Sequence, residues 1–283
     1  MIVNGYLTLQ DFKEWIVTPN QDLSVAVVDD KVIERLIQNV CRHIDDETGR
    51  HFYPTVETRY FDTPENTEDD RVLWLDDDLL AAITVTNGDD VVLLPAEYKL
   101  YPANRYPKYA LRIKESSDYY WVRDDDDNTE QVIDVLGIWG HHNNYAREGW
   151  ATGSTLDEGG ILTAADLTWT MAAVAPFEVG NIVKIENELC IVSAVGATGI
   201  TVRKRGDNGS TAATHIDTTP VTIWQTQDDI AQAAMEIAVS AYHRRWGVSA
   251  SGTATITGAG VVITPQDVPS WAAKIIASHA RAF

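Results

Sequence analysis

Five consecutive residues, Asp124 to Asn128, bring four carboxylates and an amide together. Carboxylate and amide oxygens are ligands that Ca²⁺ prefers, and an EF-hand loop also needs glycine at its sixth position and glutamate at its twelfth. Counted from Asp124, those positions hold Thr129 and Val135. The spacing therefore favours a solvated acidic turn over a calcium site.

Two adjacent histidines, His141 and His142, are the other candidate metal ligands. Two rings on one helix face need i, i+4 spacing to share an ion, so adjacent residues favour a polar turn. The sequence predicts neither a metal nor a cofactor.

Enzymatic chemistry has little support in the motifs. The chain has no G-x-S-x-G, P-loop, H-E-x-x-H or C-x-x-C pattern. The number of carboxylates leaves open an acid–base pair for glycoside hydrolysis. The aromatic run from Tyr119 to Trp121 fits either a sugar-binding platform or, more simply, strand side chains in a core. We expect a protein that is not an enzyme.

Charge limits the partners. The formal net charge of −20 makes wrapping around nucleic acid unfavourable. Acids gather at residues 65–70, 76–78 and 124–127, which suits solvated turns or a surface that nucleic acid passes without sticking. The one basic cluster is Arg203, Lys204 and Arg205. It is either a docking patch for an acidic neighbouring subunit or a solvated strand end.

Composition indicates a globular chain of 283 residues, long enough for two or three compact units. No apolar run approaches the roughly 20 residues that span a bilayer, so no membrane association is expected.

The start lacks a basic segment followed by an apolar one, so a secretory signal is not expected. Cys41 and Cys190 each lie among apolar neighbours, which predicts buried thiols in a reducing compartment.

Helical periodicity occurs at the two ends of the chain. Residues 30–47, 228–246 and 267–283 each place apolar residues on one face, and a short helix follows a capping box formed by Thr8 and Asp11. Between them, residues 55–224 read as short strands and turns, with a hairpin turn at Asn87-Gly88. We take the polar residues 141–160 as a linker.

The predicted fold is α+β, a helical bundle built from the N- and C-terminal helices with a β-rich middle. We predict a first domain from residues 1–155 and 226–283, with its β unit at 56–140, and an inserted small β-barrel or sandwich at 156–225.

Several segments, in order, resemble the head–tail connector or adaptor proteins of tailed bacteriophages. They lie in the following stretches: residues 46–54 and 57–62, 73–88, 97–102 and 137–142, then 233–245 and 268–271. Residues 5–150 and 226–283 are covered, and the β unit at 161–224 departs from the shorter family members. No single motif is diagnostic, because each is mostly a fold signature.

The resemblance implies a non-enzymatic structural subunit of a ring beneath the portal protein, in the virion neck, assembled in the bacterial cytoplasm. Family members form twelve-fold rings that join the DNA-filled head to a tail or stopper protein. The C-terminal helix would contact the portal, with Trp271, Ile275, Ile276 and Phe283 as interface residues. The acids Asp124, Asp125, Asp126 and Asp127 would line a lumen through which DNA passes without specific binding.

Two other classes remain open. One is a carbohydrate-binding or hydrolytic tail protein that uses the aromatic strands and paired acids. The other is a different virion structural part, such as a tail-terminator or baseplate subunit.

Overall fold

The computed structural model describes residues 1–16, 29–64, 70–145, 149–246, 255–256, 262–263 and 268–281. Its helices are α1 (Leu9–Ile16), α2 (Asp30–Thr48), α3 (Asp228–Trp246) and α4 (Ser270–His279). The strands of the first β unit are β1 (Thr55–Phe61), β2 (Val72–Thr86), β3 (Val92–Leu93), β4 (Tyr98–Tyr101), β5 (Lys108–Ile113) and β6 (Ile133–Trp139). Those of the second are β7 (Trp150–Thr155), β8 (Ile161–Leu162), β9 (Thr168–Thr170), β10 (Ile182–Ile185), β11 (Glu188–Val195), β12 (Gly199–Val202), β13 (His215–Ile216) and β14 (Pro220–Trp224). A last hairpin pairs β15 (Thr255–Ile256) with β16 (Val262–Ile263).

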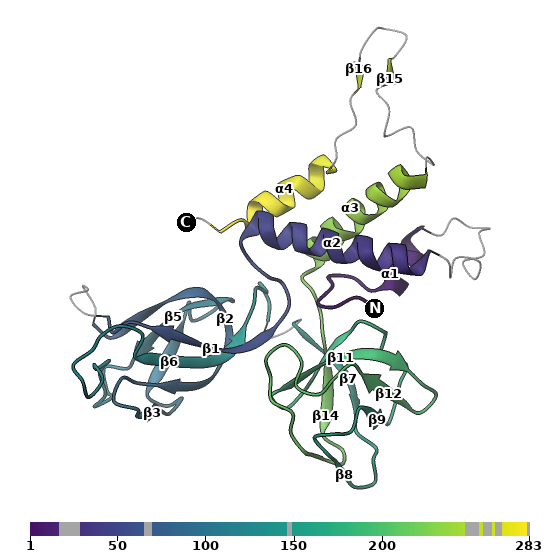
Figure 1. The fold of residues 1–283 in the computed structure, drawn as a ribbon. Coiled ribbons are helices and arrows are strands. Elements are labelled where there is room, and N and C mark those ends of the chain that lie inside the picture. Colours follow the sequence, from purple (N-terminus) through teal and green to yellow (C-terminus); the bar gives the residue numbers. More distant parts are fainter. Residues whose placement is uncertain are drawn as a thin grey trace.

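The predicted fold class is wrong. Strands hold 33% of the residues and helices 22%, so the chain is β-rich and is not a helical bundle built from the terminal helices. The physical reason is that each β unit closes its own apolar core. Because neither unit needs a bundle to bury its side chains, the four described helices form one part of the molecule beside two β bodies (Figure 1).

The helices pack around one core, which we call the helical layer. It buries Ile33, Ile37, Cys41 and Ile44 from α2, Ile230, Ala233, Ala234 and Ala238 from α3, and Ala272 and Ile276 from α4. Small alanines on α3 let the helices approach closely. α2 ends at Gly49, which takes the left-handed conformation (φ 62°) that a C-terminal cap requires. The predicted capping box is confirmed, since the Asp11 N–H donates to Thr8 Oγ1 at 3.0 Å and the Thr8 N–H to Asp11 Oδ2 at 2.7 Å.

The first β unit is an antiparallel sheet with strand order β1-β6-β2-β5-β4, and β3 pairs with β2. The predicted turn at Asn87-Gly88 is confirmed, because it joins β2 to β3 in the register Val85↔Leu93. Residues 119–122, which belong to the segment predicted to consist of short strands and turns, form no strand. Register shifts in β2 bend it so that its first part pairs with β5 and its later part with β6.

The second β unit closes into a small barrel with strand order β7-β14-β10-β11-β12-β9. Closure comes from backbone hydrogen bonds beyond β7 and β9: the Asp157 N–H donates to Thr170 O and the Ala172 N–H to Thr155 O, both at 3.0 Å. The first strand, β7, lies within the segment expected to be a linker. The side chains inside the barrel include Trp169, Val183, Cys190 and Ile200.

An apolar interface joins the barrel to the first sheet. The first sheet contributes Val56, Leu80 and Ile138, and the barrel contributes Ile182, Leu189, Ile191 and Trp224. The Trp224 indole N–H also donates to Phe52 O at 3.0 Å. Outward-facing barrel residues are therefore buried by the first sheet, so the barrel is packed against the rest of the chain.

Candidate assembly surfaces and the junction beneath them

The outer face of α4 is the first candidate surface. Trp271 is 46% exposed, whereas Ile276 is buried in the helical layer and Ile275 is half-buried against it. The predicted interface residue Phe283 lies outside the described residues. Of the predicted portal contacts that the structure describes, Trp271 has the largest exposed side chain, and Ile276 packs in the core of its own chain.

A polar junction lies where the helical layer meets the first sheet. Arg50, after α2, forms an ion pair with Asp78 on β2 and donates from Nε to the carbonyl of His279 at 2.9 Å. His141, after β6, contacts the same Asp78 carboxylate at 2.9 Å through Nδ1. The Phe52 ring lies 5.3 Å from the His141 ring and 5.7 Å from the His279 ring. We call these five residues the junction cluster.

Electrostatics hold the junction cluster together. Burial alone would raise the pKa of the Asp78 carboxyl, but hydrogen bonds from His141 and Arg50 outweigh it and lower that pKa to about 2. The end of α4 is tied to the same sheet, because Arg281 pairs with Asp77 and its N–H donates to Thr48 O at 2.8 Å. Four chain segments are therefore fixed relative to one another at this point.

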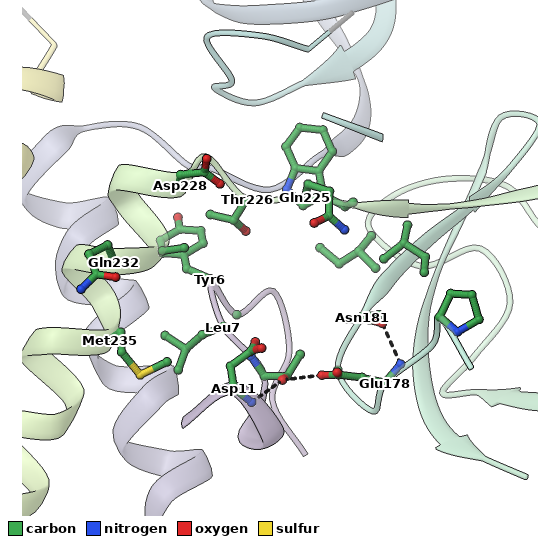
Figure 2. A pocket seen from close by; sticks show the side chains of 18 residues that line it. Tyr6, Leu7, Asp11, Glu178, Asn181, Gln225, Thr226, Asp228, Gln232 and Met235 are labelled. Atoms are coloured by element: carbon green, nitrogen blue, oxygen red, sulfur yellow. Dashed lines mark hydrogen bonds between the residues drawn. The ribbon is translucent and has the colours of Figure 1, made fainter. Parts of the chain in front are cut away.

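A pocket of about 500 Å³ lies between the N-terminal segment, the barrel and α3. Figure 2 shows its polar side chains, Asp11 and Glu178 on one side and Gln225, Thr226 and Asp228 on the other. Thr8 Oγ1 donates to Glu178 Oε2 at 2.7 Å across the pocket floor. Among the described residues that line it there is no His, Cys, Lys or Arg. Its carboxylates and amides can accept hydrogen bonds from a donor, but they provide no paired nucleophile and base.

The basic triplet is largely engaged within the barrel. The Arg205 side chain is 4% exposed and binds the Glu188 carboxylate in a two-point contact, with Nε and Nη2 each 2.7 Å from an oxygen. Arg203 and Lys204 both reach the buried Asp207 carboxylate, and Lys204 stays more than half exposed. A docking patch formed by all three residues stays a prediction, but Arg205 is held inside its own domain.

Glu188 organises this part of the barrel although it is only 1% exposed. Its carboxylate also accepts the N–H groups of Gly206 at 2.9 Å and Ala213 at 3.0 Å, and lies 2.8 Å from His215 Nε2. Burial alone would raise the pKa of this carboxyl, but the hydrogen bonds from Arg205 and His215 lower it from 4.5 to about 2. The pair Glu188–Arg205 is therefore a fully ionised brace, which sequence spacing did not reveal.

The predicted acidic lumen residues form a surface turn. Asp125, Asp126 and Asp127 are exposed, while Asp124 Oδ1 accepts the N–H groups of Asp126 at 3.0 Å and Asn128 at 2.8 Å. The turn borders an open depression of about 380 Å³ that other acids also line. In the part of the chain that the structure describes, no group of three or more His, Cys, Asp or Glu side chains is placed to hold a metal ion.

The predicted aromatic platform is divided. Trp121 is buried, whereas Tyr119 and Tyr120 are exposed. A different aromatic pair is better arranged: Trp74 and Tyr109 are stacked with ring centroids 6.1 Å apart and planes 7° from parallel. Trp74 is 64% exposed. Sequence patterns do not indicate this pair, because the two residues lie on different strands.

No family model matches the chain, and a search of the curated proteins finds no match. None of the described helices is both long and apolar enough to span a bilayer.

Proposed function

We propose that the protein is a structural subunit of a phage head–tail connector ring, which attaches beneath the portal and links the DNA-filled head to the tail. The ring would form through heterologous contacts between identical subunits, which close after a fixed rotation. Its partners would be the portal protein above and a tail or stopper protein below, with twelve copies in the virion neck.

The junction cluster is the observation that carries this proposal. The segments that resemble connector proteins are far apart in sequence, yet three of them meet there: the turn after α2 with Arg50, β2 with Asp78, and the end of β6 with His141. Resemblance spread over separated segments has more weight when those segments form one connected body. The junction cluster supports the view that the resemblance follows a shared arrangement.

The surfaces also suit an assembly subunit. Trp271 places a large aromatic side chain on the outer face of α4, and aromatic side chains are enriched where protein interfaces hold their binding energy. The net charge of −20 suits a channel that DNA passes without being retained.

The test is binding of the purified chain to purified portal, with Trp271→Ala compared with Trp15→Ala. Both tryptophans are about half exposed and lie on different helices, so the second is a matched control. We expect the wild-type chain and Trp15→Ala to bind and Trp271→Ala to lose roughly tenfold or more in affinity. A wild-type chain that does not bind portal would contradict the proposed function. Equal portal affinity of the two variants would exclude the outer face of α4 as the surface that contacts the portal.

One observation favours a second candidate, a carbohydrate-binding tail protein. Trp74 and Tyr109, whose rings are stacked with nearly parallel planes, are both exposed, and an exposed aromatic ring is a surface on which a sugar ring stacks. A glycan array separates the two functions: binding that Trp74→Ala abolishes would support this candidate, and no binding by the wild-type chain would reject it.

A further inference from the structure

The two most exposed large apolar side chains of the described residues lie directly opposite each other. Ile161 on β8 is 67% exposed, and its cross-strand partner Ile216 on β13 is 70% exposed. The other pair of this two-stranded ribbon, Leu162 and His215, is buried. The ribbon therefore turns one residue of each strand inward and presents two isoleucines to solvent, which is an unusual use of apolar surface.

The barrel holds this ribbon rigidly. His215 lies between two carboxylates, 2.8 Å from Glu188 through Nε2 and 2.8 Å from Glu186 through Nδ1. Arg205 donates to the carbonyl of Thr163, next to β8, and to the carbonyl of Ala213, close to β13, at 2.6 Å for the latter. Burying the Glu188–Arg205 pair has a desolvation cost. In this barrel the pair fixes both strands of the ribbon, so the two isoleucines are presented in one position.

Four acidic residues lie beside the ribbon: Glu158, Asp166, Glu186 and Asp217. Asp217 directly follows Ile216 in the chain and accepts the N–H of Glu158. Asp166 accepts from Thr163, which follows β8, and Glu186 contacts His215 on β13. Arg205, the base that contacts the ribbon, is already neutralised by Glu188. The surface is thus an apolar centre with a negative rim.

We propose that the Ile161–Ile216 ribbon is a docking knob for the protein that follows the ring on its tail side, which would receive it in an apolar socket rimmed by Lys and Arg side chains. Charge complementarity sets the rim of that partner, because acids around an apolar centre repel an acidic surface and attract a basic one. Figure 1 places β8 at the end of the barrel that lies away from the helical layer. In the proposed ring, α4 of the helical layer would face the portal. The inference rests on the proposed function and names the second of its two partner surfaces.

The test uses the double variant Ile161→Thr/Ile216→Thr. Threonine keeps the β-branched shape that strands favour, so the ribbon should still form. Val195→Thr, on β11 and also exposed, is the matched control. Each protein is added to portal-bearing heads filled with DNA, followed by purified tails of the same virion. Electron microscopy then counts heads that carry the ring and heads that carry a tail.

We expect all three proteins to mount on the heads. The double variant should then join tails at least roughly tenfold less well than the wild type and Val195→Thr, the loss expected when the apolar centre of an interface is truncated. Normal tail joining by the double variant would overturn the proposal that the ribbon docks on the tail-side protein, and it would leave the proposed function intact. Failure of the wild type to mount on heads would instead overturn the proposed function, and the inference with it.

A measurement on the wild-type chain tests the same proposal without depending on whether the double variant folds. Amide hydrogen exchange at residues 161–162 and 215–216 should slow when tails join the ring, while exchange in the exposed turn 125–127 stays unchanged. If amide hydrogen exchange in the ribbon is the same with and without bound tails, the proposal that the ribbon docks on the tail-side protein is also overturned.

Discussion

Replacing Glu188 by glutamine should destabilise the barrel strongly, although the two side chains have nearly the same shape. The wild-type carboxylate accepts six contacts, two from Arg205 and one each from Gly206, Ala213, His215 and the Cys190 thiol. A glutamine keeps one acceptor oxygen and places an NH₂ group against N–H donors on the other side. Arg205 would then remain buried without its counter-charge.

The magnitude follows from the pKa of this carboxyl. Lowering it from 4.5 to about 2 corresponds to about 3 kcal/mol in favour of the ionised form in the folded state. Breaking a buried ion pair by removing one partner costs roughly 3–5 kcal/mol. We therefore expect Glu188→Gln to lower the free energy of unfolding of the barrel by about 3 kcal/mol at pH 7.

The pH dependence has a defined sign. Because the pKa is lower in the folded chain, the unfolded chain binds more protons between about pH 4.5 and pH 2, so protonation favours unfolding. The contribution of Glu188 is complete above that window and is lost as the pH falls through it. Glu188→Gln should remove this part of the pH dependence.

Hydrogen exchange measured by mass spectrometry is the assay, because it reports opening free energies for barrel peptides separately from those of the first sheet. Glu57→Gln is the control, since Glu57 is an exposed partner of Arg59 on β1 and such pairs contribute about 0–1 kcal/mol. Destabilisation of the barrel by less than about 1 kcal/mol in Glu188→Gln would show that the Glu188–Arg205 pair does not stabilise it in this way.

The remaining predictions concern the helical layer. Burial raises the pKa of the Asp45 carboxyl to about 6, against hydrogen bonding from Tyr6 and the charge of Arg42. The folded chain therefore binds the extra proton, and the stability of the helical layer should fall by up to about 3 kcal/mol as the pH rises from about 4 to about 6. Asp45→Asn should abolish that slope in hydrogen exchange of α2 peptides, and an unchanged slope would contradict the assignment to Asp45. Ile276→Ala should leave a cavity and cost about 2–4 kcal/mol in thermal or denaturant unfolding, whereas Trp271→Ala should cost less than about 1 kcal/mol. Equal losses in the two variants would contradict the burial assigned to α4.

Local signals in the sequence predicted the elements that depend on them. The paired apolar residues of α2 and the stop at Gly49 predict a helix over 30–47, and the structure has Asp30–Thr48. α4 is shorter than the predicted 267–283, because Ala280 leaves the helical conformation with ψ at 134° and Arg281 then donates its N–H to Thr48 O. That end is decided by a residue far away in sequence, which periodicity does not report.

Non-local contacts account for what the sequence could not predict. The periodicity of the terminal helices predicts that they form the body of the fold, but the closure of the barrel through Asp157 and Ala172 gives the barrel its own core. The polar, glycine-containing sequence of β7 is typical of a linker, although the segment is a strand. The sequence around Arg205 indicates a surface residue, because its partner Glu188 lies on another strand.

The proposed connector ring is tested most directly by electron cryomicroscopy of the purified chain mixed with purified portal. We expect a closed ring of twelve copies on the portal, with the outer face of α4 against the portal and the barrel tip with Ile161 and Ile216 pointing away from it. A chain that stays monomeric beside free portal, or that binds the portal without closing a ring, would contradict the proposed function.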